Sequence, residues 1–175
     1  LDFWEEHELL IPYRDEGKLD FAIYDLERTK EIELVHSKKT LVQGGVANPI
    51  IAFGNYIFDT VNHDAFHIED GKLSEALVRT STTSNNIKKK QPVNMEKLDV
   101  AFEYRNISPD TYYTDEHINA VLKEYTPLLK KSSFLVPIGG IECIKTLKGL
   151  SNDKLLVIST DKGYTHDFEL EGLTD

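Results

Sequence analysis

Three nearly continuous apolar runs stand out along the chain, at residues 19–25, 49–55 and 154–159. Continuous rather than alternating apolar positions are typical of strands that are covered on both faces of a parallel sheet. Polar residues follow each run directly, so they would lie at the carboxyl ends of the strands. We therefore expect these ends to meet along one edge of a mostly parallel sheet.

Helical spacing of apolar residues predicts helices around these strands. Residues 1–16 suit an amphipathic helix that ends at Gly17. A second helix is expected from Asp115 onward, with Thr114 as its cap and Pro127 in its last turn. Both helices are expected to pack through one apolar face.

A strand–helix–strand unit is expected towards the end of the chain. It comprises a strand at 134–137, a helix at 139–150 and the apolar run at 154–159. Gly139 and Gly140 at the start of the helix hint at a close approach of the backbone to a neighbouring segment.

The region between residues 64 and 105 shows a different pattern. Asp70-Gly71 favours a tight hairpin, because both central residues of such a turn have positive φ. Expected strands flank it at 66–69 and 73–80, and a further alternating strand is expected at 98–104. We expect an antiparallel β insertion at about 64–105.

Length and composition predict one globular domain. With 40% hydrophobic and 29% charged residues over 175 positions, the chain is suited to one core. We expect residues 1–175 to form a single α/β domain with a Rossmann-like, mostly parallel sheet flanked by helices. The domain is expected to be incomplete at the N-terminus.

Charge and cysteine content argue against several classes of protein. A net charge of -10 and a pI near 5.1 disfavour a nucleic-acid partner, and Lys88-Lys89-Lys90 lies in a polar stretch at 81–96 that suits a solvated loop. Cys143, the only cysteine, has Ile141 and Ile144 as neighbours, which indicates a buried, inert thiol in a reducing compartment. No apolar run reaches the roughly 20 residues that cross a bilayer. We expect a cytoplasmic protein without a membrane partner.

Asp25 and Leu26 follow the first apolar run and suggest a nucleoside pocket. A carboxylate at a strand end can accept hydrogen bonds from a ribose or an adenine amino group, and Leu26 can cover the flat face of the base. The alternative, which the spacing alone favours, is that Asp25 caps a helix or a turn.

The segment after the second run combines an amide, an aromatic ring and an acid at Asn55, Tyr56 and Asp59. An asparagine side chain donates and accepts hydrogen bonds without titrating, so Asn55 can hold a charged group near a reacting atom. Asp59 can act as a general base or orient another group. In the alternative interpretation, Asn55 caps a turn while Tyr56 and Phe58 belong to the core.

His63, Asp64 and His67 have the spacing of metal ligands on a helix. Residues 64–69 alternate like a strand, however, which would separate the two histidines by about 13 Å. We therefore expect no metal site here, and His63 is a candidate proton acceptor near Asp59.

Segments 19–25, 48–59 and 155–164 resemble parts of class I S-adenosylmethionine-dependent methyltransferases, in particular uncharacterised relatives of the MidA-type enzymes. The resemblance covers most of the chain in the order of its motifs, apart from the insertion. It implies that the family's first strand and glycine-rich loop precede Leu1.

The resemblance also implies roles for individual residues. Asp25 and Leu26 would bind the adenosine of S-adenosylmethionine, and Asn55 and Tyr56 would line the reactive end of this cofactor. Asp59 and Asp64 would orient or deprotonate the methyl acceptor, for which the resemblance implies a protein side chain.

Two other function classes remain open. The chain contains no glycine-rich nucleotide loop, which favours a non-catalytic α/β protein-interaction module with a degenerate cofactor site. The third class is a metal-dependent hydrolase built on His63, Asp64 and His67.

Overall fold

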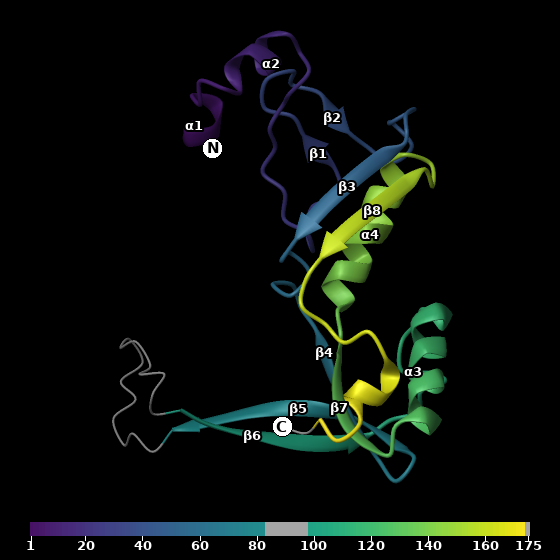
Figure 1. Ribbon diagram of the computed structural model, residues 1–175. Coiled ribbons are helices and arrows are strands. Elements are labelled where there is room, and N and C mark those ends of the chain that lie inside the picture. Colours follow the sequence, from purple (N-terminus) through teal and green to yellow (C-terminus); the bar gives the residue numbers. More distant parts are fainter. Residues whose placement is uncertain (83–97, 174–175) are drawn as a thin grey trace. The chain divides into compact units, whose positions relative to one another are not determined.

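The computed structural model describes residues 1–82 and 98–173, and the chain divides into two compact units. Unit 1 comprises Leu1–His63 and Pro137–Lys162, and unit 2 comprises Asp64–Val136 and Gly163–Asp175. The fold is mixed α/β, with one parallel strand pair and antiparallel sheets (Figure 1). The expected α/β class is confirmed at this level, whereas the Rossmann-like sheet and the single domain stay predictions.

Two short helices, α1 (Asp2–Glu5) and α2 (Ile11–Asp15), replace the continuous helix predicted at 1–16. The interruption follows from the local chemistry, because Pro12 fits only the first turn of a helix and His7 Nδ1 accepts a hydrogen bond from the Leu9 backbone. Gly17 ends α2 with a φ of 70°, as the sequence predicts.

Residues 19–25 form no strand, so the prediction of a first buried strand is wrong. The Asp20 carboxylate accepts hydrogen bonds from the backbone N–H groups of His36 and Ser37, at 2.8 and 2.9 Å. Phe21 makes one further backbone contact, its carbonyl accepting from Val35. The Asp20 side chain therefore holds this segment in position, and the segment forms no ladder of backbone hydrogen bonds with a neighbouring strand in the described part of the chain.

Unit 1 contains a parallel strand pair, β3 (Ile50–Asn55) and β8 (Leu155–Thr160), which confirms the positions of two of the three predicted apolar strands. The expected burial on both faces is wrong, because exposure varies along both strands and Phe53 and Leu156 remain 75% and 53% exposed. Helix α4 (Ile138–Leu150) immediately precedes β8 in sequence, and Figure 1 shows it alongside the pair. A small antiparallel pair joins β1 (Ile32–Glu33) to β2 (Thr40–Leu41).

Unit 2 is built on a four-stranded antiparallel sheet in the order β6-β5-β4-β7. Its strands are β4 (Asp64–Glu69), β5 (Lys72–Thr82), β6 (Leu98–Asn106) and β7 (Lys131–Val136). The unit also contains helix α3 (Glu116–Leu128) and the short 3-10 helix η2 (Asp167–Leu170). The β4–β5 turn at Asp70 and Gly71 has φ of 52° and 70°, which confirms the predicted hairpin.

Two details of unit 2 differ from the sequence expectation. Asp115, not Thr114, caps α3, its carboxylate accepting from the His117 backbone at 2.8 Å. Strand β7 pairs antiparallel with β4, whereas β8 pairs with β3, so the strands at either end of α4 belong to different sheets. The predicted strand, helix and strand are all present, but the two strands do not belong to one sheet as predicted.

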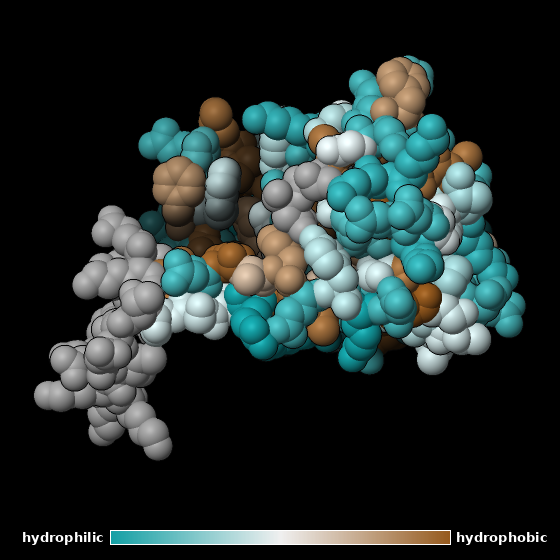
Figure 2. Space-filling view, turned by 90° about the horizontal axis from the view of Figure 1, so that it is seen from below, coloured by the Kyte–Doolittle hydropathy of each residue, from teal (hydrophilic) through white to brown (hydrophobic). Residues whose placement is uncertain are grey.

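The core of unit 2 centres on Phe66, which is fully buried and stacks on Phe134 at a ring distance of 5.7 Å. Large apolar side chains also remain at the surface, among them Phe53 and Val78, and the face in Figure 2 shows hydrophobic residues interspersed among hydrophilic ones. Among the helices within residues 1–82 and 98–173, none has the length and apolar character to cross a membrane. The Lys88-Lys89-Lys90 cluster lies outside the described residues.

Candidate functional site

The carboxyl ends of β3 and β8 form the centre of the candidate site. The two strands pair in register over their full length, which places Asn55 directly beside Thr160. The Asn55 Oδ1 atom accepts a hydrogen bond from the Thr160 hydroxyl, and the Tyr56 N–H donates to the Thr160 carbonyl at 3.0 Å. Two predicted strand ends are therefore brought together, with their polar side chains at the same edge.

Asn55 can still act as a donor at this edge. Its Oδ1 is engaged by Thr160, while Nδ2 donates no hydrogen bond within the described parts of the chain. Tyr56 follows in the left-handed region with a φ of 51° and a half-exposed ring. The chain thus turns sharply directly after the strand and leaves the amide at the surface.

Helix α4 begins close to the segment that follows β3. A Cβ added at Gly140 would lie 3.0 Å from the Phe58 ring, and one at Gly139 would lie 2.9 Å from the Val61 Cβ. The Gly139 N–H donates to the Asn62 carbonyl at 3.0 Å. The close approach that the two glycines suggested in sequence is confirmed.

Glu27 ties a third segment to this region. Its Oε1 atom accepts a hydrogen bond from the Asn62 backbone N–H at 2.7 Å and lies against Gly139. Sequence reasoning did not assign this role, although an acid two positions after Asp25 was a visible signal. Glu27 connects the turn that contains Asp25 to the loop after β3.

Asp25 and Leu26 lie in a turn rather than at the end of a strand. The Asp25 Oδ1 atom accepts from the backbone N–H groups of Glu27 and Arg28, both at 3.0 Å, which matches the alternative of a turn cap. Oδ2 accepts no hydrogen bond from the described residues, so one carboxylate oxygen remains for a ligand. Leu26 is half-buried beside it.

Asp59 and Asp64 belong to different compact units. Asp59 is exposed in the turn at 57–60, where Thr60 closes the turn onto the Ile57 carbonyl. Asp64 begins β4 and accepts a hydrogen bond from the Tyr113 hydroxyl at 2.6 Å. Burial, and then this hydrogen bond, raise the pKa of Tyr113 above its ordinary range, so the phenol stays a donor to Asp64.

His63, Asp64 and His67 do not form a metal cluster. Across residues 1–82 and 98–173, no group of three or more potential ligands lies close enough to hold an ion. Alternation along β4 sends Asp64 and His67 to opposite faces of the sheet, and His67 Nδ1 lies 3.0 Å from the Ser133 hydroxyl. His63 Nδ1 lies 2.7 Å from the Val61 carbonyl, which occupies that nitrogen.

Cys143 is buried in α4, as expected, and lies 3.8 Å from the Tyr24 hydroxyl. Burial raises the pKa of the thiol, and burial together with this contact raises the pKa of Tyr24. A thiol held protonated is a poor nucleophile, which fits the structural role that the sequence predicts.

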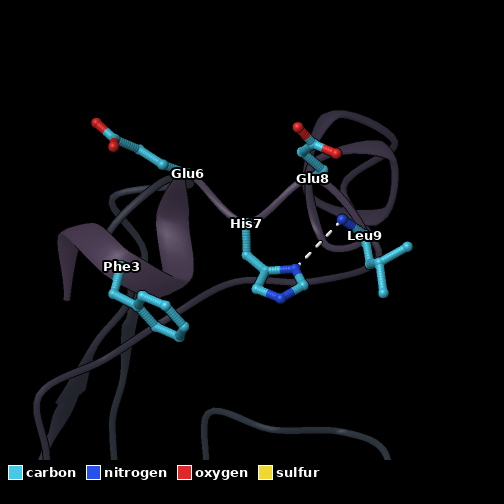
Figure 3. Close-up of a pocket in the computed structure, with 5 residues that line it drawn as sticks. All are labelled: Phe3, Glu6, His7, Glu8 and Leu9. Carbon is cyan, nitrogen blue, oxygen red and sulfur yellow. Dashed lines mark hydrogen bonds between the residues drawn. The ribbon is translucent and has the colours of Figure 1, made fainter.

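Unit 1 contains two surface hollows, and both are lined by residues other than the candidate site residues. One, of about 420 Å³, is lined by Phe3, Glu6, His7, Glu8 and Leu9, and Figure 3 shows both carboxylates turned away from the His7 ring. The other, of about 390 Å³, includes Asp20 and His36 in its lining. Neither lining contains Asp25, Asn55 or Asp59.

The arrangement can position a ligand but offers no preassembled acid–base pair. Asn55, Thr160 and the free oxygen of Asp25 are neutral or anionic hydrogen-bonding groups, and none forms a nucleophile–base contact with another residue in the described structure. Such groups suit orientation of a polar molecule through hydrogen bonds. A reaction that depends on geometry more than on proton transfer fits them best.

Comparisons with known proteins complete the description of the site. No family model matches the chain, and searches of curated proteins and of solved structures gave no match. The resemblance to methyltransferases therefore stays a prediction from the residues themselves.

Proposed function

We propose that the intact protein transfers a methyl group from S-adenosylmethionine to an acceptor. The observation that carries the proposal is the in-register parallel pair β3–β8, which holds Asn55 and Thr160 side by side at its carboxyl end. In open α/β sheets, ligands bind at this end of the strands. The close start of α4 beside the loop after β3 supports the same assignment.

The residues present can hold parts of such a cofactor. Asn55 offers Nδ2 as a donor, because Thr160 engages its oxygen. Asp25 offers a carboxylate oxygen that can accept from ribose hydroxyls, while its other oxygen maintains the turn. Leu26, half-buried beside Asp25, offers an apolar surface for a base.

The reaction would depend mainly on position. S-adenosylmethionine supplies an activated methyl group, and in-line displacement gains most from holding donor and acceptor in near-attack geometry. Asn55 and Tyr56 would line the reacting side, and Asp59 would orient the acceptor or accept its proton. The proposed acceptor is a protein side chain.

Calorimetry with S-adenosylhomocysteine on the intact protein tests the proposal. We expect Asn55→Ala to weaken binding about tenfold or more, because a hydrogen bond to a charged group contributes about 1.5–3 kcal/mol. Asn48→Ala is the matched control, since Asn48 is the same exposed residue type at the other end of β3 and should bind normally. If both variants weakened binding equally, the cofactor site would not lie at this edge of the strand pair.

A non-catalytic interaction module is the second candidate function. The observation that favours it is the exposed apolar face on β5 and β6, which includes Val78, Val100 and Phe102. Exposed apolar surface of this kind is typical of protein-interaction sites. Absence of any binding heat from the intact protein would leave this candidate ahead.

A further inference from the structure

The two edges of the sheet in unit 2 differ. Along β7, the C-terminal segment covers the edge, with Gly172 N–H donating to the Lys131 carbonyl at 2.8 Å and Ser133 N–H donating to the Leu173 carbonyl at 2.5 Å. Along β6, no segment within residues 1–82 and 98–173 pairs with the outer edge. β6 therefore presents a row of backbone donors and acceptors that can template pairing with another strand.

Strand β6 is long and has two chemically distinct faces. It pairs with β5 over nine residues, and Figure 1 shows the two strands running side by side as a ribbon. One face carries Val100, Phe102 and Tyr104, which are 59%, 38% and 47% exposed. The other face carries Asp99 and Arg105 near its two ends.

The charges on β6 are self-complementary. If two copies pair antiparallel about a twofold axis through Phe102, each Asp99 faces the Arg105 of the other copy. Because paired residues share a face, Val100 then lies opposite Tyr104 of the second copy, and Phe102 lies opposite Phe102 of the second copy. All nine residues of the strand, Leu98–Asn106, find a partner in this register.

We propose that unit 2 forms a symmetric homodimer by antiparallel pairing of β6 with β6 of a second copy, centred on Phe102. The pairing joins two four-stranded sheets into one and satisfies both open edges at once. It is isologous, so the twofold axis closes the assembly at two chains. The proposal does not depend on the methyltransferase assignment.

Neighbouring registers are disfavoured by charge. Centring the axis on Ala101 places Asp99 opposite Glu103, and centring it on Glu103 places that acid opposite itself. Like charges directly opposite each other destabilise a strand pair. Arg105 also forms an ion pair with Glu75 on β5, so in the proposed register it lies between two carboxylates.

A disulfide across the axis tests the register directly in the full chain. Phe102→Cys should form an intermolecular disulfide under mild oxidation, because facing Cα atoms in antiparallel strands lie about 4.5–5.5 Å apart, within disulfide range. Cys143 is buried and should give little background. Val78→Cys is the control, since this exposed position is on β5, about 14 Å from its counterpart across three strand spacings.

Charge reversal gives a second, independent measurement by sedimentation equilibrium. Asp99→Arg should raise the dimer dissociation constant at least about tenfold, because it sets two arginines opposite each other twice. Mixing Asp99→Arg with Arg105→Asp should restore a dimer, since every facing pair in that heterodimer is opposite in charge.

Several results would overturn the proposal. They are a wild-type chain that stays monomeric at high micromolar concentration, equal crosslinking at Phe102→Cys and Val78→Cys, and a dimer that Asp99→Arg leaves unchanged. If another part of the same chain covered the β6 edge, the protein would stay monomeric, which is the first of these results.

Discussion

Replacing Gly139 with alanine tests whether α4 begins as tightly against the loop after β3 as the site requires. The added Cβ would lie 2.9 Å from the Val61 Cβ and 3.1 Å from the Asn62 backbone nitrogen, and Glu27 Oε1 would be closer still. Glu27 can swing away as the end of a flexible side chain. The Val61 branch point and the Asn62 backbone cannot yield without moving the loop.

The expected magnitude is the difference of two effects. Overpacking of this kind costs about 1–3 kcal/mol, while replacing a helical glycine with alanine returns about 0.5–1 kcal/mol. The two ranges leave a net loss centred on about 1 kcal/mol, so we expect Gly139→Ala to lower the free energy of unfolding by about that amount. For a chain of this length, that corresponds to a fall in Tm of about 2–4 °C.

The assay is thermal and urea unfolding followed by circular dichroism. Gly163→Ala is the control, because a Cβ there meets nothing within 4 Å and its φ is not positive, and its stability should stay within about 0.5 kcal/mol of wild type. A Gly139→Ala variant as stable as the wild type, or more stable, would show that the helix start and the loop are not in contact.

Two further predictions concern hydrogen-bonded side chains. The backbone N–H of His36, followed by the hydroxyl and then the backbone N–H of Ser37, holds the pKa of Asp20 well below its usual range, so its contribution to stability is complete above the unfolded pKa of about 3.9 and is lost as pH falls below it. Unfolding measured between about pH 5 and pH 2 should therefore show a weaker pH dependence for Asp20→Asn than for the wild type, and an unchanged dependence would argue against these hydrogen bonds. Tyr113→Phe should destabilise the protein by about 1–2 kcal/mol in urea, because it removes a hydrogen bond to the Asp64 carboxylate. Tyr56→Phe, which alters a half-exposed ring, should leave stability unchanged, and equal effects of the two tyrosine variants would argue against the Tyr113–Asp64 contact.

The sequence alone located most of the regular elements. The apolar runs before Asn55 and Thr160 predicted the positions of β3 and β8, because a short apolar run bounded by turn residues favours a strand, but not their exposure, since Phe53 and Leu156 lie at the surface. Asp70-Gly71 predicted the hairpin, since few other dipeptides adopt two positive φ angles at low cost. The turn-cap alternative for Asp25 was also visible in the spacing.

The wrong predictions share a cause, which is that an apolar run does not specify the segment with which it pairs or packs. Residues 19–25 are apolar, yet the Asp20 carboxylate and the 36–37 backbone hold them without a strand. The apolar run at 134–136 does not indicate whether its strand pairs with β4 or with β8. Asp64, a candidate catalytic acid in the sequence, accepts a hydrogen bond from Tyr113, forty-nine positions away, and no local pattern indicated this partner.

Local sequence therefore determined which segments of this protein become strands, helices and tight turns, because backbone conformation and periodicity depend on neighbours a few positions apart. Tertiary structure decided which strands pair, which edge stays open and which polar groups meet. The Asn55–Thr160 contact spans 105 positions, and the link between Glu27 and Asn62 spans 35. Such contacts follow from the closing of the chain on itself, which no local pattern encodes.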